Sequence, residues 1–201
     1  MVVDLSVLWA GPLATSLLAA IGAEVIKVDP EARPDGLRHH DEVYRYLNGN
    51  KSVVDLDLRQ DADRRQFEAL LERADLLVDS FSRRVMPNFG YRPADLLVRF
   101  PRLSWISIVA FPLGSAEQHW VSYGPGVHAI SGLADRGTGP FQPAPIAYPD
   151  AVAGLLAFAV AAEMLWTGTS SGRAEISLAG ALAPLIDRAV ADRDRTEGET
   201  R

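Results

Sequence analysis

A single carboxylate stands at the start of a long apolar run. Asp150 follows Pro149, and no further charged residue occurs before Glu163. A carboxylate that stays ionised in apolar surroundings can act as a nucleophile. Aspartate at this place is also a preferred helix N-cap, which stabilises a helix by about 1 kcal/mol. Residue type alone favours the cap, but the two roles are compatible, because a helix start presents free amide donors and the positive end of its dipole.

Basic side chains are concentrated in one long loop and in one later pair. A ligand that carries phosphate groups needs several such partners, because guanidinium and ammonium groups donate charge-assisted hydrogen bonds to phosphate oxygens. The basic residues in question are Arg33, Arg38, His39, His40, Arg45, Lys51, Arg83 and Arg84. For any one of them, a solvated surface position is the simpler explanation.

Several common motifs are absent from the sequence. No GxGxxG follows the first strand-like segment, which disfavours ordinary dinucleotide binding, and neither a GxxxxGK[ST] phosphate loop nor a GxSxG nucleophile elbow occurs. The histidines lack the spacing of metal ligands on a helix, since His39 and His40 are adjacent and His119 and His128 are isolated. We therefore expect no metal site and no tightly bound cofactor.

The composition is typical of a soluble globular protein. Hydrophobic residues make up 48% of the 201 residues and charged residues 23%, which is ordinary for one domain with a sizeable core. Lysine and arginine total 20 against 26 acids, and the net charge of -6 provides no basic field for nucleic acid. Cysteine is absent, which excludes disulfides and thiolate chemistry.

The sequence offers no export or membrane signal by simple criteria. The first 28 residues are apolar, but they contain Asp4, no lysine or arginine before Lys27, and the interruption Gly11-Pro12. The apolar run after Asp150 meets a charge after about four helical turns, so we expect no uninterrupted membrane span. A cytoplasmic location follows as the default expectation.

The chain alternates between strand-like and helix-like segments. Residues 2–8 are largely β-branched and apolar, and after the turn signal AGP the leucines and alanines of residues 13–22 favour a helix. Residues 23–29 resemble the continuous apolar strands of parallel sheets. Further strands are expected over residues 52–58, 75–81, 103–111 and 172–178, with helices over residues 43–47, 61–74, 93–100, 127–135, 151–166 and 179–191.

This alternation predicts an α/β, Rossmann-like domain with a mostly parallel sheet and helices on both faces. We expect one domain over residues 1–190, followed by a charged and frayed tail over residues 191–201. The helix over residues 151–166 is apolar nearly all round, so we expect it to be buried, partly against another subunit.

Seven segments of the sequence, taken together, carry a resemblance to a known family. In order they are VVDLSVLWAGPLATSLLAAIGAEVIKVD, LNGNKSVVDLDL, ADLLVDSFSRRVMPNFGY, WISIVAF, YGPGVHAISGL, YPDAVAGLLAF and GRAEISLAGAL. This order resembles the family III CoA-transferases, also called the CaiB/BaiF family, from residue 2 to about residue 183. Members of that family are longer and continue into a second, smaller domain, so the chain resembles a short form or the N-terminal half.

The resemblance implies a catalytic role for Asp150. In the family, the aspartate that begins the long apolar helix attacks an acyl-CoA thioester, and an aspartyl-CoA thioester carries the coenzyme to an acceptor carboxylic acid. Coenzyme A is then a substrate and carrier rather than a bound cofactor. The resemblance and the phosphate argument together assign CoA binding to Gly11, Pro12, Arg33, Arg38, Asn50, Lys51, Phe81, Arg83, Arg84 and Tyr123.

Some positions depart from the family pattern. The arginine that usually follows the phenylalanine is Ser82, with Arg83 and Arg84 displaced, and the acid that usually follows the tyrosine is Gly124. Tyr123 stands where the related acyl-CoA racemases carry a histidine, which favours transfer over racemisation. Two alternatives stay open, namely an acyl-CoA racemase or isomerase and a non-catalytic CoA-binding or interaction protein.

The resemblance also implies partners. Acyl-CoA and a carboxylic acid are the expected substrates, and a homodimer, or pairing with a separate chain, is expected to complete the site. Nucleic acid and membranes are not expected partners.

Overall fold

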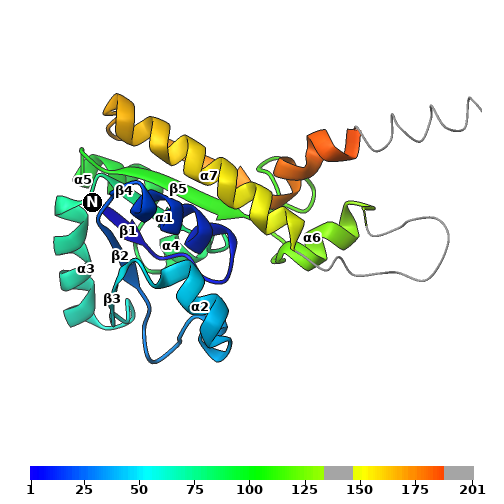
Figure 1. Ribbon diagram of the computed structural model, residues 1–201. Coiled ribbons are helices and arrows are strands. Elements are labelled where there is room, and N and C mark those ends of the chain that lie inside the picture. Colours follow the sequence, from blue (N-terminus) through cyan, green and yellow to red (C-terminus); the bar gives the residue numbers. More distant parts are fainter. Residues whose placement is uncertain (134–146, 188–201) are drawn as a thin grey trace, which may run out of the picture.

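The computed structural model describes residues 1–133 and 147–187, which form a layered α/β structure (Figure 1). Six strands make one sheet in the order β3-β2-β1-β4-β5-β6, and every neighbouring pair is parallel. The strands are β1 (Val2–Asp4), β2 (Val25–Val28), β3 (Ser52–Val54), β4 (Leu76–Asp79), β5 (Ser104–Val109) and β6 (Arg173–Ser177). The predicted fold class is confirmed.

Helices cover both faces of the sheet. The described helices are α1 (Ala10–Ala20), the 3-10 turn η1 (Gly36–His39), α2 (Asp41–Asn48), α3 (Asp61–Arg73), α4 (Val85–Asn88), α5 (Pro93–Arg99), α6 (Gly124–Ile130), α7 (Tyr148–Thr167) and a helix over Leu178–Asp187. One hydrophobic core lies between the sheet and α1 and α7, and a second lies between the sheet and α3, α4 and α5. Strands β1, β2, β4 and β5 are buried at every residue because both faces are covered. The predicted tail over residues 191–201 lies outside the described residues.

The strand order reverses between β1 and β4. The chain builds outward from β1 through β2 and β3, then returns to add β4, β5 and β6 on the other side. In open parallel sheets, ligands bind outside the strands' carboxyl ends at the point where the order reverses. The helices that follow these strands therefore begin at the edge where a site is expected.

Helix α7 lies along α1, and both helices run in the same direction (Figure 1). Small side chains on α7 allow this close packing: Ala153, Ala157 and Ala161 are buried against the α1 side of the core. A β-carbon at Gly154 would lie only 2.7 Å from the carbonyl oxygen of Ala10, so only glycine fits there. This contact fixes the start of α7 beside the start of α1.

The opposite side of α7 is exposed in the single chain, and burial of this side against another subunit stays a prediction. Leu155 and Leu156 are exposed, and Trp166 is 93% exposed. The helix has 20 residues and is apolar enough, by length and composition alone, to cross a membrane. The helix reaches this length only with Asp150 and Glu163 inside it, so the expectation that no uninterrupted apolar run spans a membrane is unchanged.

Candidate active site

The carboxyl group of Asp150 is buried between the starts of α6 and α7. Asp150 is 8% exposed and lies in the first turn of α7, whose N-cap is Ala147. The predicted N-cap role is therefore wrong, because Tyr148 and Pro149 occupy the first two helical positions and place Asp150 third. Proline is well tolerated there, since its missing N–H has no partner in a helix start.

Asp150 packs directly on the backbone of Gly124. A β-carbon at Gly124 would lie 1.7 Å from Oδ2 of Asp150, so any side chain at this position would displace the carboxylate. Gly124, the first residue of α6, thus leaves room for the carboxyl group because it has no side chain.

Burial and hydrogen bonding act on the pKa of Asp150 in opposite directions. Burial raises it, the backbone N–H groups of Gly124 and of Asp150 itself lower it, and the result is a pKa of about 6. No cationic side chain of the described residues is among the groups that set this pKa. The carboxylate is therefore mainly ionised at neutral pH, and it is more basic than an exposed aspartate.

The loop between β1 and α1 lies at the same level as Asp150. Gly154 contacts Ala10, and Asp150 is one helical turn before Gly154 on the buried side of α7. The loop over residues 6–9 directly precedes Ala10, the first residue of the neighbouring and parallel helix α1, by about one helical turn. The carboxyl group of Asp150 and this loop thus occupy the same edge of the sheet.

Four predicted CoA-binding residues gather around the first half of α1. Gly11 and Pro12 are buried in its first turn, and a β-carbon at Gly11 would collide with Ser6 at 2.1 Å. Asn50 is exposed and donates to the carbonyl oxygen of Ser16 at 3.0 Å. Glycine at position 11 is thus required for packing, and Asn50 ties the loop before β3 to α1.

Lys51, the fourth of these residues, points inward. Its ammonium lies 3.0 Å from Oδ2 of Asp4 and 2.7 Å from the hydroxyl of Thr15, and it also reaches the Pro12 carbonyl and the Asn48 side chain. The side chains of Lys51 and Asp4 have no exposed surface. In this structure the ammonium of Lys51 is committed to the protein interior, so it does not present a free cation to a phosphate.

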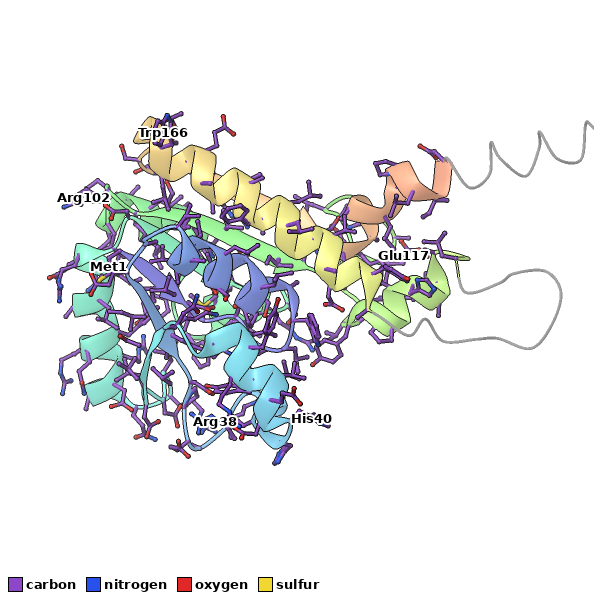
Figure 2. The ribbon with its side chains drawn as sticks, in the orientation of Figure 1. Met1, Arg38, His40, Arg102, Glu117 and Trp166 are labelled. Carbon is purple, nitrogen blue, oxygen red and sulfur yellow. The ribbon has the colours of Figure 1, made fainter. Side chains whose placement is uncertain are left out.

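The predicted arginines fall into two groups. Arg38 donates to Asp29 at 2.7 Å and to Glu31, and Arg83 binds Glu175 at 2.6 Å, so both guanidinium groups already have carboxylate partners. Arg33 and Arg84 are exposed. Figure 2 shows Arg38 beside α2, away from the start of α7.

Phe81 and Tyr123 lie at the edge that carries the site. The N–H of Phe81 donates to Asp79 at 2.9 Å, which fixes the turn after β4. Tyr123 is exposed and is the N-cap residue of α6, directly before Gly124. The structure therefore brings Tyr123 close to Asp150 along the chain of α6, whereas Arg38 and Arg83 lie in separate ion pairs.

Sequence reasoning missed His128. This residue is 8% exposed, lies one turn after Gly124 on α6, and its ring is 6.2 Å from the ring of Tyr148. Its Nδ1 atom is buried, and it has no hydrogen-bond partner in the described part of the chain. Gly124 and His128 are four residues apart, which indicates that they share one face of a helix. This signal points to the site only when α6 is known to pack against α7.

The described part of the chain has no cluster of metal ligands, and a surface groove lies away from this site. Within residues 1–133 and 147–187, no group of three or more His, Cys, Asp or Glu residues could hold a metal ion. A groove of about 560 Å³ lies between the C-terminal ends of α1 and α7, at the opposite end of these helices from Asp150. Its lining residues include Leu18, Ile21, Leu165 and Trp166.

Two curated relatives are similar over most of the chain. Acetyl-CoA:oxalate CoA-transferase of Acetobacter aceti is 29% identical over 140 residues, which cover 66% of this chain and 36% of the relative. Alpha-methylacyl-CoA racemase of Homo sapiens is 30% identical over 179 residues, which cover 87% of this chain and 45% of the relative. The chain thus spans less than half the length of either relative.

A solved structure shows the same fold. A CaiB/BaiF family protein from Brucella suis matches with a TM-score of 0.80 at 22% identity, over 94% of this chain and 56% of that structure. The sequence also matches the family described as "CoA-transferase family III" over residues 1–201. The chain therefore belongs to the family III CoA-transferases, also called the CaiB/BaiF family.

Proposed function

We propose that the protein transfers coenzyme A between an acyl-CoA donor and a carboxylic acid, with Asp150 as the nucleophile. The observation that carries this proposal is the buried Asp150 carboxyl group at the start of α7, in contact with the Gly124 backbone, in a member of this family. Desolvation makes the carboxylate a stronger nucleophile, and the nearby N–H groups keep it ionised.

The proposed reaction has two halves and needs no external proton. In the first half, an Asp150 oxygen attacks the thioester carbon, the C–S bond breaks, and CoA leaves as a thiolate. The thiolate then attacks Cγ of Asp150 in the mixed anhydride, and the C–O bond breaks to release the donor acid as a carboxylate. Asp150 now carries CoA as a thioester.

The second half repeats these steps in reverse with the acceptor. The acceptor carboxylate attacks Cγ of Asp150, and the thiolate leaves to give a second mixed anhydride. The thiolate then attacks the acceptor acyl carbon, which frees Asp150 as a carboxylate. A covalent intermediate thereby lets donor and acceptor acids use one pocket in turn.

The predicted CoA-binding residues differ in whether their side chains are exposed to solvent. Arg33, Arg84, Asn50 and Tyr123 are exposed and can contact the coenzyme directly. Lys51 is committed to buried partners. We propose that Lys51 supports binding by holding α1 and the NGNK loop together, while the exposed residues meet the phosphates and adenosine.

Asp150→Asn tests the proposed function against simple CoA binding. An enzyme that uses this carboxylate loses transfer from an acyl-CoA to a free acid, whereas its affinity for CoA remains. Glu163→Gln is the control, because Glu163 is exposed at the other end of the same helix. Full transfer by the Asp150→Asn protein would overturn the proposal. A wild-type protein that binds CoA but shows no transfer would favour a non-catalytic binding protein.

Racemisation of an acyl-CoA is the second candidate. It is favoured by the matched human racemase and by His128, a buried imidazole whose Nδ1 has no hydrogen-bond partner among residues 1–133 and 147–187, on the helix that contacts Asp150. Such a reaction moves a proton at the carbon next to the thioester. Exchange of that proton in deuterated water, abolished by His128→Gln, would support racemisation, and transfer without exchange would exclude it.

A further inference from the structure

The loop that joins β1 to α1 contains a backbone conformation that leucine rarely adopts. Leu8 has a φ of 64°, in the left-handed region where the β-carbon is crowded by backbone. Among the described residues other than glycine, only Ser171 shares a positive φ. Such conformations persist where the surroundings over-determine them, and they cluster at functional sites.

A buried ion pair holds Leu8 in this conformation. The N–H of Leu8 donates to the two carboxylate oxygens of Asp35, at 3.1 and 3.2 Å. The ammonium of Lys27 lies 3.2 Å from Oδ2 of Asp35 and donates to the carbonyl of Ser6 at 2.7 Å. Neither Lys27 nor Asp35 has any exposed side-chain surface. The pair therefore grips the loop at both Ser6 and Leu8.

The rest of this loop is also held by side chains from other segments. The N–H of Ser6 donates to Asp4 at 2.8 Å, and the N–H of Val7 donates to the hydroxyl of Ser80 at 2.9 Å. Three consecutive amides thus bond to side chains from β1, from the segment after β2 and from the segment after β4. The loop is fixed from three directions at the sheet edge that carries Asp150.

Stability alone does not explain this arrangement. A buried ion pair stabilises a protein little compared with well-packed apolar residues of the same volume, because both charges lose their hydration. Here the pair also maintains a strained backbone, which further opposes folding. The desolvation of the ion pair and the strain at Leu8 both concern the loop that lies level with the Asp150 carboxyl group.

We propose that Lys27 and Asp35 are positioning residues for the transfer reaction. They hold the backbone of residues 7–9 as one wall of the space in which the thioester meets the Asp150 carboxylate. This inference rests on the proposed function. It predicts that loosening the wall lowers the rate of the chemical step more than it weakens CoA binding, because small misplacements of reacting groups are costly in rate.

Asp35→Asn is the primary test, because it keeps an acceptor for Leu8 but removes the charge that Lys27 pairs with. We expect kcat for transfer to fall about tenfold to about a hundredfold, with the KM for acyl-CoA little changed. Hydrogen exchange at the amides of Ser6 and Leu8 should become faster. Lys27→Met is a second variant that should act in the same direction.

Leu8→Gly separates positioning from general stability. Glycine adopts a φ near 64° without strain, so Leu8→Gly added to Asp35→Asn should restore much of the lost kcat. Ser171→Gly is the matched control, because it removes the same kind of strain at an exposed turn and should restore nothing.

The outcomes distinguish this inference from the proposed function. If the wild-type protein transfers CoA, and Asp35→Asn and Lys27→Met fold but keep its kcat, the positioning role is wrong while the proposed function stands. Equal restoration by Leu8→Gly and Ser171→Gly would also overturn the positioning role, since it would point to stability alone. If the wild type shows no transfer, the proposed function fails and the inference fails with it.

Discussion

The Asp150 carboxylate combines two properties that usually exclude each other in a side chain. It is shielded from water, yet its pKa of about 6 leaves it mainly ionised at neutral pH, because backbone N–H groups at the starts of α6 and α7 partly offset its desolvation. No ion pair is needed for this balance. Gly124, the first residue of α6, is as important as Asp150, since only glycine at this position leaves room for the carboxyl group.

Gly124→Ala should abolish most of the transfer activity while the protein still folds. The new methyl group would lie 1.7 Å from the present position of Oδ2, so the carboxylate must move out of its place. Gly126→Ala is the matched control on the same helix, because its methyl group meets only the movable hydroxyl of Ser122. Transfer rates of the two variants check this, and equal rates would contradict the described contact.

Asp150→Asn should make the protein more stable at neutral pH. Because the folded-state pKa of about 6 exceeds the ordinary value of 3.8, the folded state binds this proton more tightly than the unfolded state does. Protonated Asp150 therefore stabilises the folded state fully below pH 3.8, and this stabilisation is lost as the pH rises through about 6. At pH 7 the ionised group lowers the free energy of unfolding by about 1–3 kcal/mol, which the substitution recovers.

Urea denaturation of wild type and Asp150→Asn at several pH values measures this effect. The difference in unfolding free energy should be present at neutral pH and should disappear as the pH falls below about 4. A difference that grows toward low pH would have the wrong sign for a raised pKa. Glu163→Gln should show neither trend.

At the scale of elements, buried charges on β1, on β2 and directly before β3 connect these strands to α1. Although burial raises its pKa, Asp4 is held at about 2 by the charges of Lys51 and Lys27 and by the hydroxyls of Ser6 and Thr15. Asp4 and Lys51 are 47 positions apart in sequence, and their contact connects the NGNK loop to the first turns of α1. The site therefore depends on charges that a ligand does not reach.

Lys51→Met should destabilise the protein by about 3–5 kcal/mol, because it leaves Asp4 as an unpaired buried charge. Adding Asp4→Asn should recover part of this loss. The midpoint of urea unfolding provides the measurement. A variant with an unchanged midpoint and a lost affinity for CoA would instead show that the lysine is free to bind the coenzyme.

Local patterns in the sequence predicted the elements well, but not the contacts between them. Apolar β-branched runs and helix-forming stretches were sufficient to indicate the parallel sheet, because these signals are local. The inward direction of Lys51 was not predictable, since it depends on Asp4 in another strand. The start of α7 was placed three residues late, at residue 151 instead of Tyr148, because Pro149 and Asp150 match both a cap and a first turn.

Asp150 itself was identified from its apolar surroundings and from the resemblance to the family. His128 and the pair of Lys27 and Asp35 were not, because their importance depends on burial. A lysine inside an apolar strand could have indicated a buried partner. Only the folded chain shows which carboxylate that partner is.

At the scale of the whole molecule, the outer face of α7 lacks cover within the described residues. Leu155, Leu156 and Trp166 are exposed along it, although a helix this apolar is normally packed on most sides. The chain also spans less than half of the length of the two curated relatives. A homodimer, or pairing with another chain, remains the prediction for what covers this face.

Leu155→Glu combined with Leu156→Glu should weaken that assembly. Two carboxylates on an apolar interface lose hydration when the partner binds, so the native mass should shift from dimer to monomer. Val98→Glu, at an exposed position on α5, is the control and should leave the mass unchanged. A wild-type monomer that transfers CoA at full rate would contradict the prediction.

The most direct test of the central claim is to trap the activated carboxyl group of Asp150. The protein is incubated with an acyl-CoA donor and hydroxylamine, which attacks Cγ of an aspartyl thioester, releases CoA and leaves a hydroxamate. Peptide mass spectrometry should find this modification at Asp150 and nowhere else, and only when donor is present. Transfer activity with an unmodified Asp150, or with the hydroxamate on another carboxylate, would contradict the account.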